Sequence, residues 1–166
     1  CTEKDRYAEK TIVDSVKYPV RLTYAGRLDK DSDGLIILTN DGELIERMMR
    51  GANRHEKEYI VKVDREYTDD FLEKMSRGVY LRELDETTRP CFVERVGKYT
   101  FRIILTQGLN RQIRRMCERF GYKVKSLTRI RVMNIELSGL KTGAYRELKG
   151  QELTTLYRLC GMSEKN

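Results

Sequence analysis

Residues 26–42 read GRLDKDSDGLIILTNDG, in which a polar loop leads directly into an apolar run. Alternating residues in Val20–Tyr24 predict a strand before the loop, and the apolar run Leu35–Thr39 predicts a buried strand after it. The loop Gly26–Gly34 therefore brings several carboxylates to the junction of two strands. These carboxylates belong to Asp29, Asp31 and Asp33. A loop of this composition fits a metal site, a catalytic site or a charged turn.

The spacing of the aspartates matches the start of a calcium-binding EF-hand loop, D-x-D-x-D-G. An EF-hand loop needs a bidentate glutamate at its twelfth position, where this chain has Asn40, and its ninth position here is Ile37. The flanking residues are typical of strands, whereas an EF-hand is flanked by helices. The sequence therefore argues against a calcium site.

A catalytic interpretation places one carboxylate beside Arg27 at the end of a strand. An acid held near an arginine stays ionised and can act as a nucleophile or a base. Asp29 follows the apolar Leu28 and is the best candidate for an inward-facing position. Asp31 and Asp33 are two and four residues further along, so alternation would place all three on the same side. The spacing alone therefore does not choose among them.

The rest of the chain contains more predicted strands than helices. Strands are expected at Lys57–Val63, Cys91–Val96, Tyr99–Thr106 and within Val124–Leu137. Helices are expected at 43–50, from a Thr68 cap to Gly78, at Arg111–Phe120 after an Asn110 cap, and at Gln151–Leu159. Because strands and helices do not alternate strictly, we expect an α+β fold with a mixed, mostly antiparallel sheet flanked by helices. No repeat or proline-rich linker divides the sequence, so residues 1–166 are expected to form one domain.

Positive charge is concentrated in one segment of a chain whose net charge is +7. Residues 111–131 contain eight arginines and lysines and one acid, Glu118. A solvated helix face normally mixes both signs, so this segment predicts binding to phosphates and hence a polyanionic partner.

Several classes of protein are excluded or disfavoured by composition. No apolar run approaches the roughly 18 residues that span a bilayer. The four cysteines, at positions 1, 91, 117 and 160, lack the C-x-x-C spacing of a zinc site. We therefore expect reduced thiols in a cytoplasmic protein that has no membrane partner. The single histidine, His55, lies in a polar run and is expected to be a loop residue.

Three ordered motifs resemble those of the pseudouridine synthases of the RsuA type. The segment 26–42 resembles their catalytic motif, Lys57–Val61 resembles their tyrosine motif, and residues 108–122 resemble their third motif. Within this family, the residues around His55–Tyr59 and Gln107–Cys117 look most like the RluF-type enzymes of 23S rRNA. The resemblance covers about Ala25 to Leu140 and implies the pseudouridine synthase fold, with a basic RNA-binding cleft.

The resemblance also implies roles for individual residues. Asp29 matches the essential aspartate, which acts at the ribose C1′ so that uracil detaches, rotates and rejoins through C5. Tyr59 matches the tyrosine that stacks on the target base, and Arg114 matches the arginine that pairs with the aspartate. Arg27 matches the arginine that helps to hold the flipped RNA, and Leu127 matches the apolar residue that backs the base. Further contacts with substrate RNA are expected from the basic segment 111–131, at Arg111, Arg115 and Arg129.

The family implies an isomerase that uses no metal or organic cofactor and acts on rRNA, most closely 23S rRNA, and we expect the protein to be a monomer. Other 23S sites, 16S rRNA, and a non-catalytic RNA-binding module for ribosome assembly remain as alternatives. Members of this branch usually carry an N-terminal S4 RNA-binding domain followed by a strand with a Lys-Pro motif. Neither precedes Cys1, so the chain is expected to be a catalytic-domain fragment.

Overall fold

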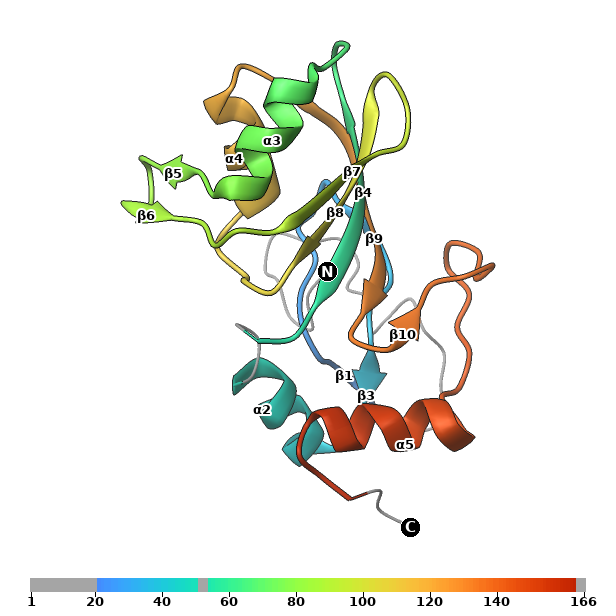
Figure 1. Cartoon of the computed structure of the whole chain (residues 1–166). Helices are drawn as coiled ribbons and strands as arrows, with labels where there is room; N and C mark the ends of the chain where they lie inside the picture. Colours follow the sequence, from blue (N-terminus) through green and yellow to red (C-terminus); the bar gives the residue numbers. More distant parts are fainter. Residues whose placement is uncertain (1–20, 51–53, 164–166) are drawn as a thin grey trace.

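A sheet of six strands forms the centre of the structure, a computed structural model that describes residues 21–50 and 54–163 (Figure 1). The strand order is β10-β9-β4-β8-β7, and β2 pairs separately with β9. These strands are β2 (Asp33–Gly34), β4 (Lys57–Val63), β7 (Phe92–Arg95), β8 (Thr100–Leu105), β9 (Val124–Val132) and β10 (Ile135–Glu136). All pairs in this sheet are antiparallel except β2 with β9, which are parallel. The predicted α+β fold with a mixed, mostly antiparallel sheet is confirmed.

Helices α3 (Asp69–Arg77) and α4 (Gln112–Arg119) cover one face of this sheet. The face is apolar because alternate residues of β4 and β8, such as Val61 and Phe101, point toward the helices and are fully buried. Thr68 caps α3 by accepting a hydrogen bond from the Phe71 amide at 3.1 Å, as the sequence predicted.

A second apolar cluster lies at the other end of the molecule, where α2 (Gly42–Arg50) and α5 (Gly150–Leu159) meet (Figure 1). Its buried members include Leu44 of α2 and Leu156 of α5. Asp41 joins the two helices, because its carboxylate caps α2 and also accepts a hydrogen bond from the Tyr157 hydroxyl at 2.8 Å.

The shorter strands differ from the sequence prediction. Only Thr23–Tyr24 (β1) and Leu38–Thr39 (β3) pair with each other, while Val20 lies outside the described residues. Leu35 and Ile37 are buried, but they do not form a continuous strand. The Leu35 amide donates to the Arg129 carbonyl of β9, whereas the Ile37 carbonyl accepts from the Ala25 amide, so the two residues pair with different segments. The predicted strand at Leu35–Thr39 is therefore wrong over its first three residues. A further hairpin joins β5 (Tyr80–Leu81) to β6 (Glu86–Thr87).

The thiols of Cys91, Cys117 and Cys160 are free, as expected, whereas Cys1 lies outside the described residues. None of the helices within residues 21–50 and 54–163 has both the length and the apolar composition needed to cross a lipid bilayer.

Candidate active site

The predicted catalytic aspartate lies on a loop, residues 27–35, which we call the aspartate loop. The loop ends in β2, where Asp33 pairs with Thr128 and Gly34 with Arg129 of β9. Gly34 has φ of +112°, and a Cβ atom added there would lie 2.2 Å from the Arg129 carbonyl oxygen. Only glycine fits this approach, so the sequence of the loop specifies its contact with the sheet.

Arg129 holds the base of the aspartate loop with its side chain as well as its backbone. Its Nε donates to the Leu35 carbonyl at 2.9 Å, and its Nη1 donates to the Arg27 carbonyl at 3.4 Å. The residue is only 5% exposed. Burial lowers the pKa of its guanidinium, while interaction with the Tyr59 side chain opposes that shift. The structure therefore directs Arg129, one of the expected RNA contacts, toward the protein backbone.

Two arginines at the start of α4 hold the tip of the aspartate loop. Arg111 donates to both carboxylate oxygens of Asp31, at 3.2 and 3.3 Å, and this hydrogen bonding lowers the pKa of Asp31. Arg114 donates from Nη2 to the Asp31 backbone carbonyl at 2.7 Å. The predicted ion pair between Arg114 and Asp29 is wrong in this structure, because Arg114 is paired with Asp31 and Asp29 lies 4.0 Å from Arg111.

The start of α4 explains how Arg111 reaches the loop. Arg111, rather than the predicted Asn110, occupies the cap position, and its backbone is left-handed with φ of +49°. The Asn110 side chain is instead used to accept a hydrogen bond from Arg115. Left-handed backbone at a non-glycine residue is strained and clusters at functional sites.

Asp29 itself remains open to solvent, with a side chain that is 43% exposed, whereas the preceding Leu28 is buried. The expected inward orientation therefore belongs to Leu28. Asp29 faces the surface, where a ligand can reach its carboxylate.

Tyr59 lies on β4 opposite Arg129, on the same face of the sheet as Val61. The residue is half-buried, packs against the main core and interacts through its side chain with Arg129. Leu127 is buried in the main core opposite Val61, where it acts as a packing residue. Arg27 and Arg111 are exposed, and Arg115 is half-buried.

Asp31, Asp33 and Lys57, which have no role assigned from sequence, also lie in this region. Asp31 anchors the loop to α4, and Asp33 accepts a hydrogen bond of 2.5 Å from the Thr128 hydroxyl. Lys57 lies on the face of β4 that carries Tyr59, and burial together with the nearby Arg129 lowers its pKa to about 8. Because Lys57 and Tyr59 are two residues apart on β4, strand alternation could have placed Lys57 on the face of Tyr59. No sequence signal distinguished the partners of the three aspartates.

The aspartate carboxylates point to different partners. All three are exposed, but Asp31 is hydrogen-bonded by Arg111 and Asp33 by Thr128, whereas Asp29 lies 4.0 Å from Arg111 and accepts no side-chain hydrogen bond within the described residues. Among the residues that the structure describes, no three histidine, cysteine, aspartate or glutamate side chains come together as metal ligands. The loop instead holds the exposed carboxylate of Asp29 at 4.0 Å from Arg111, on a backbone that arginines fix, an arrangement suited to nucleophilic or base chemistry.

Comparison with known proteins gives consistent results. The family model described as RNA pseudouridylate synthase matches residues 1–119. The chain is 51% identical over 148 residues to the dual-specificity RNA pseudouridine synthase RluF of Escherichia coli (strain K12), covering 89% of this chain and 50% of that protein. It is 37% identical over 163 residues to the ribosomal large subunit pseudouridine synthase B of Bacillus subtilis (strain 168), covering 94% of this chain and 66% of that protein.

A crystal structure of a pseudouridylate synthase superposes with a TM-score of 0.78 at 32% sequence identity, covering 84% of this chain and 62% of that one. The chain spans about half the length of the curated RluF proteins that it matches.

Proposed function

The chain belongs to the RNA pseudouridylate synthase family, and on that premise we propose that it converts uridine to pseudouridine in RNA. The observation that carries this proposal is the accessible carboxylate of Asp29 on a loop held by Arg111, Arg114 and Arg129. A carboxylate that must attack or deprotonate a bound ribose needs both access and a fixed position.

In the proposed reaction, Asp29 acts at the ribose C1′ region while the N1–C1′ glycosidic bond breaks. The detached uracil rotates, a C5–C1′ bond forms, and the proton on C5 is released as N1 regains a proton. No redox step or net loss of atoms occurs, so the reaction is an isomerisation. Arg114 and Arg111 act on Asp29 through the loop, whose tip they hold at Asp31.

The target uridine must leave its helix before Asp29 can reach it, which costs a few kcal/mol. Tyr59, which is half-buried, supplies the aromatic ring for stacking in this proposal, and base–aromatic stacking contributes about 1–3 kcal/mol per base. Exposed cations such as Arg27 and Arg111 offer contacts to phosphates, with Arg115 beside them. Leu127, buried under this region, supports the site from below.

We propose 23S rRNA as the substrate, and a cytoplasmic monomer as the active form. The name of the B. subtilis relative refers to the large ribosomal subunit, and that of the E. coli relative to dual specificity, so a second RNA substrate belongs in the test. In this proposal residues 1–166 serve as the catalytic domain.

Tritium release from RNA carrying C5-labelled uridine tests the activity. The wild-type chain should release tritium from 23S rRNA transcripts, and Asp29→Asn should abolish release while RNA binding persists. Asp70→Asn, which removes an exposed carboxylate from α3, is the matched control and should retain turnover. Turnover in Asp29→Asn would remove Asp29 from the mechanism. Salt-sensitive binding without release from any rRNA would favour the non-catalytic RNA-binding alternative.

A further inference from the structure

A β-bulge on β9 separates two arginines that a regular strand would place on one face. Glu58 pairs with Arg131 and the adjacent Tyr59 pairs with Arg129, so Ile130 is an extra residue on β9. Successive residues of β4 point to opposite faces, and cross-strand partners share a face. Arg129 therefore points to the face of Tyr59, and Arg131 points to the opposite face. Bulges of this kind re-aim side chains and are frequent next to active sites.

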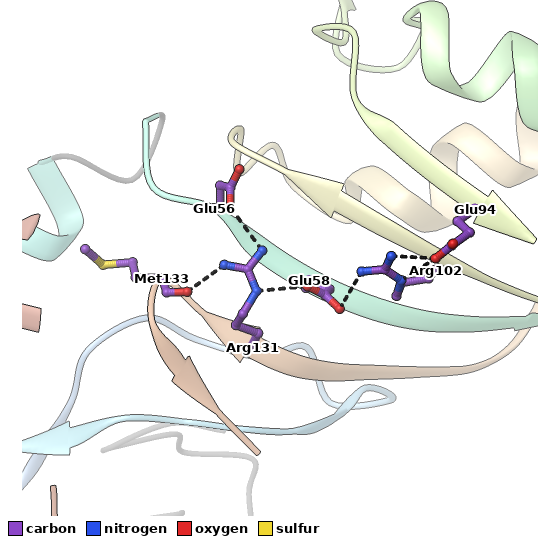
Figure 2. Close-up of polar contacts among 6 residues, drawn as sticks. All are labelled: Glu56, Glu58, Glu94, Arg102, Arg131 and Met133. Carbon is purple, nitrogen blue, oxygen red and sulfur yellow. Dashed lines mark hydrogen bonds and ion pairs between the residues drawn. The ribbon is translucent and has the colours of Figure 1, made fainter. Parts of the chain in front are cut away.

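Arg131 joins a row of ion pairs that crosses the sheet, which we call the charge ladder (Figure 2). It donates to Glu58 at 2.8 Å and to Glu56 at 3.0 Å, and Glu58 accepts a second bond from Arg102 at 3.0 Å. Arg102 continues the ladder to Glu94 on β7 at 2.8 Å. The charge of Arg131 is thus matched by carboxylates.

Arg129 has no carboxylate partner among residues 21–50 and 54–163, although it is more deeply buried than Arg131. A buried guanidinium without a counter-ion is unfavourable for stability and calls for a functional explanation. Its two bonds to backbone carbonyls are eight residues apart in sequence, at Arg27 and Leu35, and therefore bridge the two ends of the aspartate loop.

We propose that Arg129 is a positioning residue that clamps the aspartate loop, and that the bulge at Ile130 keeps it apart from the charge ladder by turning Arg131 to the opposite face. The inference rests on the proposed function for its catalytic consequence, and it replaces the expected RNA contact of Arg129 with a contact inside the protein. A planar guanidinium can donate to two carbonyls at once, whereas a lysine ammonium acts as a compact point charge. The clamp therefore requires the shape of arginine as well as its charge.

Arg129→Lys and Arg129→Gln test the clamp. Both variants should lower kcat on the order of 10²-fold, since a misplacement of about 1 Å at a catalytic group has that effect. KM and the Kd for RNA should change less than about threefold, and the salt dependence of binding should stay the same, because no phosphate contact is lost. Arg131→Lys is the matched control on the same strand and should keep kcat within about twofold.

A second readout does not depend on activity. Hydrogen exchange at the Ser32 and Leu35 amides, which bond to Asp29 and Arg129 carbonyls, should accelerate in Arg129→Gln and not in Arg131→Lys. Full activity of Arg129→Lys, or a weaker Kd with a smaller salt slope and unchanged kcat, would overturn the proposal. If the wild-type chain is inactive, the proposed function fails, while the exchange measurement still decides whether the loop is clamped.

Thermal unfolding identifies a variant that does not fold. In that case Thr128→Val, which removes the neighbouring bond to Asp33, should lower kcat and accelerate exchange in the same direction by a smaller factor. Unchanged kcat and unchanged exchange in Thr128→Val would then count against a clamp at this strand.

Discussion

Arg129 and Arg131 leave the same strand on either side of one bulge and meet opposite surroundings. Arg131 is bound by Glu58 and Glu56 in the charge ladder, where positive and negative groups alternate across the sheet. Arg129 is buried against carbonyl groups of the aspartate loop. Matched charges serve the stability of the sheet, whereas the unmatched charge holds a loop whose regular hydrogen bonds are few. Changes on the loop face should therefore affect turnover, and changes on the ladder face should affect stability alone.

The largest effect is expected at Gly34, where loop and sheet touch. Gly34→Ala would place Cβ within 2.2 Å of the Arg129 carbonyl oxygen, so the pairing of β2 with β9 must open. We expect kcat to fall more than about 10²-fold and the free energy of unfolding to drop by about 2–4 kcal/mol. Gly97→Ala, at a glycine with nothing within 4 Å of an added Cβ, should change neither quantity appreciably. Normal turnover in Gly34→Ala would show that this contact does not position Asp29.

Arg114 gives the next test, at the tip of the loop. Arg114→Gln removes the 2.7 Å bond to the Asp31 carbonyl, so kcat should fall about 10- to 100-fold with a smaller change in KM. Arg119→Gln, at the exposed end of the same helix, should leave kcat within about twofold. Equal losses in both variants would indicate a general effect of positive charge in α4.

Lys57 tests the excess of positive charge on the loop face. Its pKa of about 8 lies below the ordinary 10.5, so the protonated side chain destabilises the folded state below pH 8. Lys57→Met should raise the free energy of unfolding at pH 7 by about 1–2 kcal/mol. The wild type regains this difference as the pH rises from 8 to 10.5, so denaturant unfolding should show the two proteins converging. A difference that is independent of pH would contradict the burial of a charged Lys57.

Glu58 gives the smallest effect and probes the ladder face. Burial alone would raise the pKa of Glu58, but hydrogen bonds from Arg131 and Arg102 outweigh it and lower the pKa. Glu58→Gln should therefore reduce the free energy of unfolding by about 1 kcal/mol at pH 7, and the difference should shrink as the pH falls from the ordinary pKa of 4.5 through the lowered pKa of the folded state. Turnover should remain within about twofold. Glu94→Gln, at the exposed end of the ladder, should have a still smaller effect on stability. A large loss of turnover in Glu58→Gln would link the ladder to catalysis.

The core elements could be predicted because their signals are local. The strand Lys57–Val63 agrees with its alternating pattern, and α3 begins at its Thr68 cap as expected. The start of α4 was mispredicted, because a long arginine side chain bound to Asp31 outweighs the local preference for an asparagine cap.

The candidate site was predictable in its composition but not in its pairings. Asp29, Tyr59 and Arg114 were identified by motif; Asp29 and Tyr59 remain the proposed catalytic residues, and Arg114 is proposed to position the loop through Asp31. The partner of Arg114 could not be read from sequence, because Asp29, Asp31 and Asp33 have the same spacing and parity. Asp31 and Asp33 also lie about 80–95 residues from their hydrogen-bond partners at the start of α4 and on β9. Only folding brings these distant residues together.

The sequence by itself determined the family, the α+β class and the aspartate loop, because periodicity, glycines and ordered motifs act over short distances. Tertiary structure alone decided which aspartates accept hydrogen bonds from α4 and β9, which arginine is buried without a counter-ion among the described residues, and which carbonyls that arginine binds. A one-residue bulge at Ile130 contributes to the second of these, since it turns Arg131 toward the carboxylates of the charge ladder and leaves Arg129 on the opposite face. Such a bulge follows from the pairing of distant strands, and the local sequence of β9 does not specify it.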